Sequence, residues 1–316
     1  MLTEDEALAG IRVLVAVAQA DGKIAPAERE MLADALTHFG AKLPGGVTVD
    51  AVLDEKADVV LEAAKLKSPA AKDAVFQAAI AMATLDGTKE SEQKVLAQLR
   101  ATLAYDDVGP GSVVSALQRA VVTSGLKVAP IQDATVRAEQ ITKRISREAF
   151  YATLFAMLPI PVFSDIAITL TQVGLIESIA TYYGHPLSRK ERLATFAPLL
   201  GLVMLATALH AVTKLVPVWG TVAAGAIVYA TTVGLGRAVT HYFESEGKAT
   251  TEELRKVFLA AKAEGKAAYG DQRKRLDATT KTHSEELKAL AKDFSEGTID
   301  LAEYEARADK LVGNDD

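Results

Sequence analysis

Apolar residues in the first 125 positions recur with the period of an α-helix. Leu8, Ile11, Leu14 and Val15 share one helical face, and this first helix is expected to end at the Asp21-Gly22 pair. The same spacing, together with Ser68 as a candidate N-cap before a proline, predicts three further helices. These helices are expected over residues 26–39, 50–65 and 68–85. We therefore predict an all-α fold for this part of the chain.

Two stretches of this region are alike. AVAQADGKIAPAERE (16–30) and AIAMATLDGTKESEQK (79–94) each contain an alanine-rich helix, an Asp-Gly pair and a glutamate six or seven residues after the aspartate. Each copy reads as a helix, a tight acidic turn and a second helix. The sequence thus predicts a helical bundle with an internal pseudo-repeat.

The repeat supplies four carboxylates at matching positions. Asp21 corresponds to Asp86, and Glu28 corresponds to Glu92. If the two turns meet, these oxygens form a site for a hard divalent cation such as calcium or magnesium. The alternative is structural, because aspartate and glycine also build tight turns and a glutamate near a helix N-terminus is favoured by the helix dipole. Both interpretations stay open.

Residues 126–243 are basic and strongly apolar. A polar helix that carries Lys143, Arg144 and Arg147 leads into two apolar runs, 149–164 and 166–176, both shorter than the roughly 17–25 residues of a membrane-spanning helix. We expect two helices that meet at Pro159-Ile160-Pro161, with Asp165 as a cap or local hydrogen-bonding group of the second. The basic cluster faces either anionic lipid or solvent.

The next two runs carry no formal charge and are longer. Leu193–Thr213 and Leu215–Gly236 are separated by Lys214, and the second run has small residues at Ala226, Ala230 and Gly234 that favour close packing on the first. The sequence predicts a hydrophobic helical hairpin over 193–236 that either spans a membrane or forms the core of a soluble protein. Basic residues at both of its ends favour cytoplasmic termini by the positive-inside rule.

Charge divides the chain into three predicted parts. Residues 1–125 have a net charge of −6, residues 126–243 of +4 and residues 244–316 of −4. The last part reads as a charged, solvated helical arm that ends in a helix, a turn at Gly297 and a helix capped by Asp300. So small a hairpin buries little surface alone, so we expect it to self-associate or dock, with an autonomous hairpin as the alternative.

Each part resembles a known family. ADGKIAPAERE and LDGTKESE resemble the TerB-like fold of tellurite-resistance and related bacterial stress proteins, over about residues 4–106. The series Pro-Ile-Pro, Tyr-Gly-x-Pro-Leu-Ser, Val-Pro and Gly-Arg-Ala over about 149–245 is similar to the YcjF-like bacterial inner-membrane family. The C-terminal hairpin resembles the oligomerisation module called SHOCT. These resemblances imply a membrane-associated stress protein with a GTPase partner and a self-associating tail.

Several classes of chemistry are disfavoured. The chain has no cysteine and five histidines, and it lacks the phosphate-binding loop and the serine-hydrolase and zinc-protease motifs. Its acidic balance disfavours nucleic acid as a partner. We expect a non-enzymatic scaffold or adaptor on the cytoplasmic face of a bacterial inner membrane. The alternative is a soluble helical interaction protein that regulates a separately encoded GTPase.

Overall fold

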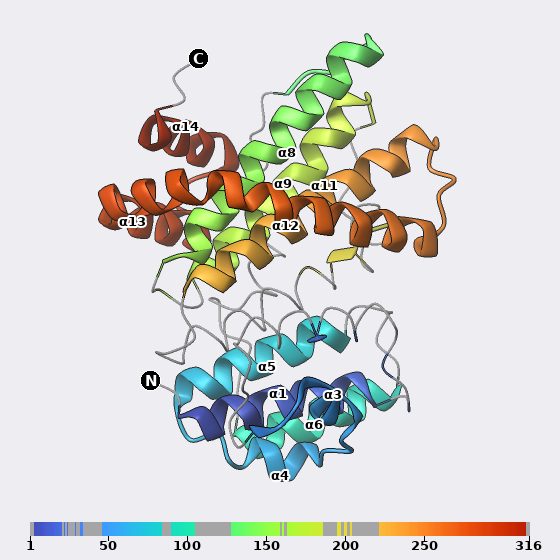
Figure 1. The fold of residues 1–316 in the computed structure, drawn as a ribbon, viewed down its shortest axis with the longest axis vertical. Coiled ribbons are helices and arrows are strands. Elements are labelled where there is room, and N and C mark those ends of the chain that lie inside the picture. Colours follow the sequence, from blue (N-terminus) through green and yellow to red (C-terminus); the bar gives the residue numbers. More distant parts are fainter. Residues whose placement is uncertain are drawn as a thin grey trace. The chain divides into compact units, whose positions relative to one another are not determined.

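The computed structural model of the chain is all-α and divides into two compact units. One unit comprises Met1–Gly109 with Leu200–Ala224, and the other Pro110–Leu199 with Gly225–Asp316. The structure describes residues 3–20, 46–83, 90–104, 128–158, 160, 163–185 and 221–313, and the single positions 22, 24, 29, 32, 33, 195, 196, 199, 200 and 203. Helices account for most of these residues (Figure 1).

The first unit is built around two central helices. Helix α1 (Glu4–Ala18) packs against α5 (Pro69–Ala83) and the short α4 (Val59–Ala63), and α6 (Glu90–Leu103) packs on α4 and α5. The predicted apolar face of α1 is confirmed, because Leu8, Ile11, Leu14 and Val15 are all buried. The predicted start of α5 is also confirmed, since the Ser68 hydroxyl accepts a hydrogen bond of 3.1 Å from the Ala71 amide.

One predicted helix of this unit is wrong. Residues 50–65 form two short helices, α3 (Val49–Asp54) and α4, instead of one. The break occurs because Asp58 starts a new helix, and its carboxylate accepts hydrogen bonds from the amides of Val60 and Leu61 at 2.8 and 3.1 Å. Two hydrogen bonds connect α1 to the chain before α5. The carboxylate of Glu6 accepts them from the amides of Lys67 and Ser68 at 2.8 and 2.9 Å.

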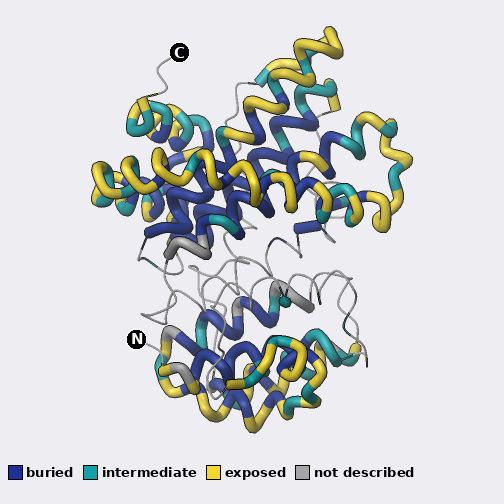
Figure 2. The backbone as a smooth tube through the Cα atoms, viewed as in Figure 1, coloured by how far each residue is buried: buried dark blue, intermediate teal, exposed yellow. Residues whose placement is uncertain are grey.

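The second unit surrounds one apolar helix. Helix α8 (Ala134–Ala156) packs along α9 (Phe163–Tyr182), and the predicted polar helix and the first apolar run prove to be one continuous helix, α8. The elbow between α8 and α9 lies where the sequence predicts it, although Pro159 and Pro161 are outside the described residues. Most residues of α9 are buried, and its tube is mostly dark blue in Figure 2. Asp165 is buried in the first turn of α9.

Helix α9 has the length and apolar composition of a membrane-spanning helix, and it alone does among the described parts of the chain. Its apolar window is 89% buried inside the protein. A core helix of a soluble protein meets the same two criteria, so α9 does not by itself distinguish a membrane span from a core. Of the predicted hairpin, most of 193–213 lies outside the described residues, and 215–236 is described from Thr221 onward.

Helix α11 (Thr221–Glu244) carries the predicted strip of small residues, but the strip packs on a helix that the sequence did not suggest. A side-chain carbon at Gly234 would come within 2.8 Å of the Phe258 carbonyl oxygen, and one at Gly265 within 3.0 Å of the Ala230 Cα atom. Both Phe258 and Gly265 belong to α12 (Thr251–Thr282). The absence of side chains at these glycines therefore lets α11 and α12 approach closely.

The last three helices belong to the same hydrophobic core as α8 and α9. Most residues of α12 are exposed, as expected for a solvated arm, but one face of the helix packs on the core, where Phe258, Tyr269 and Leu276 are buried. Helices α13 (Ser284–Glu296) and α14 (Leu301–Val312) form the predicted hairpin, with Gly297 at a φ of 74° in the turn. Its apolar residues join the core around α8 and α9, namely Leu287, Leu290, Ala291, Phe294, Ile299, Leu301, Tyr304 and Ala308.

Candidate functional site

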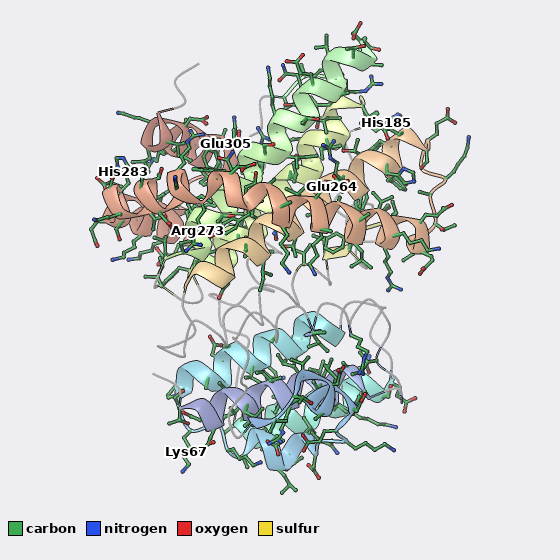
Figure 3. All side chains as sticks on the ribbon, in the orientation of Figure 1. Lys67, His185, Glu264, Arg273, His283 and Glu305 are labelled. Carbon is green, nitrogen blue, oxygen red and sulfur yellow. The ribbon has the colours of Figure 1, made fainter. Side chains whose placement is uncertain are left out.

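A cluster of charged side chains lies between α8 and α14. Arg144, Arg147 and Glu148 follow one another at the spacing that places side chains on one face of α8, and Glu305 and Asp309 lie one turn apart on α14. Figure 3 shows Glu305 on α14 beside α8. We call these five residues the clamp. It joins two segments separated by about 160 residues of sequence.

The contacts of the clamp are bidentate and mostly buried. The Arg144 guanidinium donates to both carboxylate oxygens of Glu305, with 3.1 Å between Nη1 and Oε2. Arg147 Nη2 donates to Glu305 Oε2 at 2.7 Å, and Arg147 Nη1 lies 3.6 Å from Asp309 Oδ2. The side chain of Arg144 is only 7% exposed and that of Glu305 13%. Paired guanidinium and carboxylate groups of this geometry hold two helices in one register.

Glu148 is the least compensated member of the clamp. It is completely buried, and its Oε1 atom lies 3.1 Å from Arg144 Nε and 3.4 Å from Arg147 Nε. Within the described residues these contacts are ion pairs without well-directed hydrogen bonds. Burial raises the pKa of Glu148, and the negative charge of Glu305 raises it further, whereas the two arginines act in the opposite direction.

The pKa values of the two guanidinium groups are also raised, which for arginine favours the charged form. Burial alone would lower the pKa of Arg147, but Glu148, Glu305 and Asp309 raise it above its ordinary value, so that the side chain stays charged. The clamp therefore holds two permanent cations against three carboxylic acids. Protonation of Glu148 would leave two carboxylates facing the two guanidinium groups, so that the charges of the clamp balance.

Aromatic side chains continue the contact on the apolar side of the clamp. The ring of Tyr304 on α14 stacks on Phe294 at a centroid distance of 4.3 Å and meets Phe155 of α8 at 5.7 Å. The hydroxyl of Tyr151 donates to Asp309, and burial raises the pKa of Tyr151. Charged and apolar contacts together fasten the α13–α14 hairpin to α8 and α9 of its own chain.

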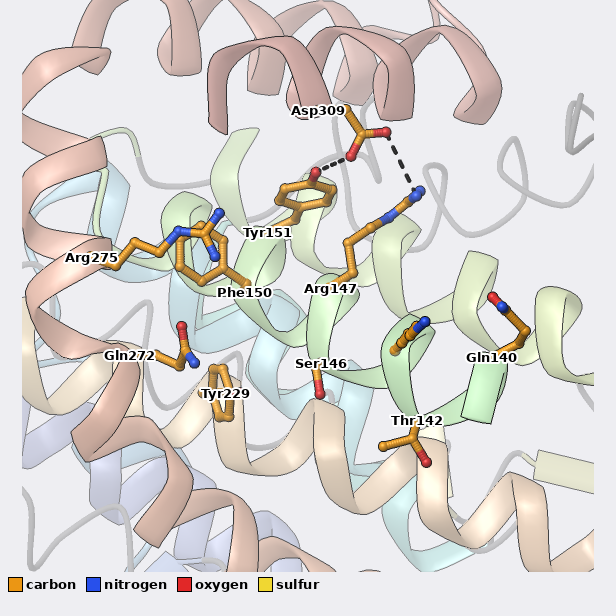
Figure 4. A pocket seen from close by; sticks show the side chains of 11 residues that line it. Gln140, Thr142, Ser146, Arg147, Phe150, Tyr151, Tyr229, Gln272, Arg275 and Asp309 are labelled. Atoms are coloured by element: carbon orange, nitrogen blue, oxygen red, sulfur yellow. Dashed lines mark hydrogen bonds and ion pairs between the residues drawn. The ribbon is translucent and has the colours of Figure 1, made fainter. Parts of the chain in front are cut away.

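A groove of about 740 Å³ runs along the outer face of α8, next to the clamp (Figure 4). Its lining comes from α8, α11, α12 and α14. The lining residues are Gln140, Thr142, Lys143, Ser146, Arg147, Phe150, Tyr151, Tyr229, Gln272, Arg275 and Asp309. Figure 4 shows Arg147 and Tyr151 directed toward Asp309, and Arg275 beside the ring of Phe150.

The basic cluster of α8 was located by the sequence but misinterpreted. Arg144 is buried and faces α14, so it contacts neither lipid nor solvent, and Arg147 is 27% exposed and engaged by the same helix. Lys143 alone of the three has the predicted exposed position, and it pairs with Glu139 at 2.8 Å. The Glu305–Asp309 pair, one turn apart on α14, is the feature of the sequence from which the clamp could have been predicted.

The predicted cation site falls outside what can be described. Asp21, Glu28 and Asp86 are not among the described residues, and Glu92 lies in α6 with its side chain outside them. Next to the first turn, Arg29 pairs with Asp54 at 2.8 Å and with Asp50 at 3.2 Å. Among the side chains that the structure does describe, no group of three or more histidine or acidic residues is placed to hold a metal ion.

Comparison with known proteins gives no relative from which a role could be transferred. The chain matches no family model, no curated protein and no solved structure in the comparisons made.

Proposed function

We propose that the protein is a non-enzymatic scaffold or adaptor that associates with the cytoplasmic face of a bacterial inner membrane. The observation that carries the scaffold is the clamp, which fixes the C-terminal hairpin on a helical core. Such a core is a rigid platform on which partner-binding surfaces keep fixed positions. The TerB-like resemblance of residues 4–106 supports a role in a stress response, and no cofactor is part of the proposal beyond a divalent cation at the acidic turns.

The membrane part of the proposal rests on the uncharged run 193–213. We assign lipid contact to this run and to the start of 215–236 because both lack formal charge, while Phe196, Leu199, Leu200 and Val203 of the run are buried in the protein, as α8 and α9 are. Arginine at the centre of a membrane helix costs about 2.5–3.5 kcal/mol on insertion scales. Substituting Leu205→Arg should thus move the protein from the membrane fraction to the soluble fraction.

Ala268→Arg is the matched control, because residue 268 is exposed on α12 and the added charge is the same. It should leave the membrane fraction unchanged. Recovery of the unmodified full-length protein without detergent, monodisperse and free of lipid, would refute the anchor.

The 89% burial of α9 favours a second candidate function. In this alternative the protein is a soluble helical interaction protein that regulates a separately encoded GTPase. Such a chain should unfold cooperatively without detergent, and adding it should change the nucleotide turnover of a GTPase that co-purifies with it. Unchanged turnover would count against this candidate.

Self-association through the tail is part of the first proposal. The apolar face of the α13–α14 hairpin packs on its own chain, so a second copy would bind the exposed face or exchange hairpins. Light scattering of the full-length protein distinguishes a monomer from such an oligomer. A strictly monomeric protein at micromolar concentration would remove self-association from the proposal.

A further inference from the structure

We propose that the groove along α8 is a binding site for a phosphate-bearing ligand, either a soluble phosphorylated compound or the headgroup of an anionic lipid. This inference goes beyond the scaffold function, because it assigns a ligand to the groove, which shares Arg147 and Asp309 with the clamp. Four elements of one unit contribute to the groove, so its walls are positioned by the core.

The charge and donor groups of the lining fit an oxyanion. Lys143, Arg147 and Arg275 bring three cations to the lining, which contains one carboxylate, Asp309. Lys143 is also paired with Glu139 and Arg147 with Glu305, so an anion in the groove would share these cations with the carboxylates. Amide and hydroxyl donors stand beside them at Gln140, Thr142, Ser146 and Gln272. Guanidinium groups bind phosphate oxygens through paired N–H donors, and a lysine supplies a point charge next to them.

Arg275 is oriented for this role. Its guanidinium carbon lies 4.8 Å from the centre of the Phe150 ring, and Phe150 is itself buried. Stacking on an aromatic ring uses the face of the guanidinium group, whereas its N–H donors lie at the edge of the same plane. The stacked arrangement therefore fixes the direction in which this cation can meet an anion.

The size and the aromatic side chains of the groove set an upper limit on the ligand. A volume of about 740 Å³ lies within the range of small-molecule sites, roughly 300–1,000 Å³. Tyr229 from α11 and Phe150 and Tyr151 from α8 give the lining a buried apolar part. A phosphate group attached to a compact organic body matches both the charged and the apolar portions.

Ligand binding in the groove would reach the clamp through Arg147. This guanidinium lines the groove and also contacts α14, and its contact with Asp309, at 3.6 Å, is longer than its 2.7 Å contact with Glu305. A phosphate at Arg147 competes first with Asp309. Occupation of the groove should therefore change the amide hydrogen exchange of the last turns of α14.

The test is calorimetric titration of the full-length protein with inorganic pyrophosphate. The groove variant carries Lys143→Gln and Arg275→Gln, two exposed positions whose substitution should leave the fold intact. The control variant carries Arg273→Gln and Lys274→Gln, which remove the same charge from exposed positions of α12 outside the groove; Arg273 is labelled in Figure 3. Thermal unfolding followed by circular dichroism verifies that both variants are folded.

Loss of a charge-assisted hydrogen bond weakens binding by about tenfold or more. We expect the groove variant to bind pyrophosphate at least about tenfold more weakly than the unmodified protein, and the control variant to bind as the unmodified protein does. The proposal would be overturned if the unmodified protein bound neither pyrophosphate nor the acidic vesicles described below. It would also be overturned if the groove variant bound as tightly as the unmodified protein.

A sedimentation assay with vesicles identifies the source of the phosphate. Vesicles of phosphatidylcholine with phosphatidic acid are compared with vesicles of phosphatidylcholine alone. Binding to the acidic vesicles that is lost in the groove variant indicates a lipid headgroup. Binding to pyrophosphate that is lost in the groove variant, without an effect on vesicles, indicates a soluble ligand. Binding to the neutral vesicles tests the proposed membrane anchor at residues 193–236 and does not test the groove. The two proposals can therefore be refuted independently.

Discussion

Two buried glutamates, one in each unit, show opposite consequences of burying a carboxylate. Glu6 in the first unit accepts hydrogen bonds from the backbone amides of Thr3, Lys67 and Ser68. Burial raises its pKa, but these hydrogen bonds outweigh burial, and the pKa of Glu6 is lowered. Glu148 in the second unit has two cations beside it, and its pKa is nevertheless raised.

The difference lies first in the depth of burial, since Glu148 is completely buried and Glu6 lies nearer the surface, and then in how the donors are directed. The amides around Glu6 are fixed by the helix start and by the turn before α5, so they point at the carboxylate at no further cost in conformational freedom. The arginines near Glu148 direct their terminal donors to Glu305 and Asp309, and their Nε atoms face Glu148. Complete burial thus outweighs the shared guanidinium groups at Glu148, whereas fixed backbone donors outweigh the shallower burial of Glu6.

The largest expected effect comes from removing a cation of the clamp. Arg144→Met leaves Glu148 and Glu305 buried with one arginine fewer, and breaking a buried ion pair in this way costs about 3–5 kcal/mol of stability. Urea unfolding of the full-length protein should show this loss. Hydrogen exchange should also locate the loss in α13 and α14.

Lys143→Met is the matched control, because the adjacent lysine is 65% exposed and its ion pair is with Glu139 on the same helix. Exposed pairs contribute about 0–1 kcal/mol. Equal losses for the two variants would contradict the clamp.

A smaller loss of stability is expected when Glu6, the buried glutamate of the first unit, is replaced. Glu6→Ala removes the acceptor for three partly buried backbone amides, and a hydrogen bond to a charged group contributes roughly 1.5–3 kcal/mol. Hydrogen exchange at Lys67 and Ser68 should accelerate with the loss of stability. Asp5→Ala is the control, since Asp5 is the exposed neighbouring acid, and it should have little effect on those two amides.

The smallest effects are expected in the pH dependence of stability, where the contributions of the two glutamates should change with pH in opposite directions. The stability that Glu6 contributes relative to Glu6→Gln is present above the ordinary pKa of about 4.5 and is lost as the pH falls through its lowered pKa. Relative to Glu148→Gln, the contribution of Glu148 is present below the ordinary pKa and is lost as the pH rises through its raised pKa. Urea unfolding at several pH values measures both differences.

The groups that face Glu148 set this second slope. They are Arg144 and Arg147 on its own helix and Tyr304 and Glu305 on α14. The arginines and Tyr304 keep one protonation state over the range between about pH 4 and 8, because arginine ionises near 12 or above and burial raises the pKa of Tyr304. Slopes of the same sign for the two glutamates would contradict the comparison.

Local features of the fold were predictable from the sequence. The amphipathic face of α1, the cap of α5 by Ser68 and the turn at Gly297 each depend on residues within a few positions of one another. The break before α4 was also readable, since Asp58 is a standard N-cap residue, but the alanine and valine residues around it suggested one continuous helix.

Features that depend on distant partners were not predictable in this way. The cluster at Arg144 and Arg147 looked like a surface because its carboxylate partners come about 160 residues later. Helix α12 looked like a solvated arm because it has few large apolar residues. Those few lie on one face, at Leu254, Phe258, Tyr269 and Leu276, and the long charged side chains between them obscured the stripe.

The central claim, that the clamp fastens the C-terminal hairpin to α8, is tested most directly by a double-mutant cycle between Arg144 and Glu305. Arg144→Met, Glu305→Gln and the double variant are compared with the unmodified protein by urea unfolding. Because the two side chains are in direct contact, we expect the double variant to lose less stability than the two single losses combined, with a coupling of about 1–3 kcal/mol. Additivity within about 0.5 kcal/mol would contradict it.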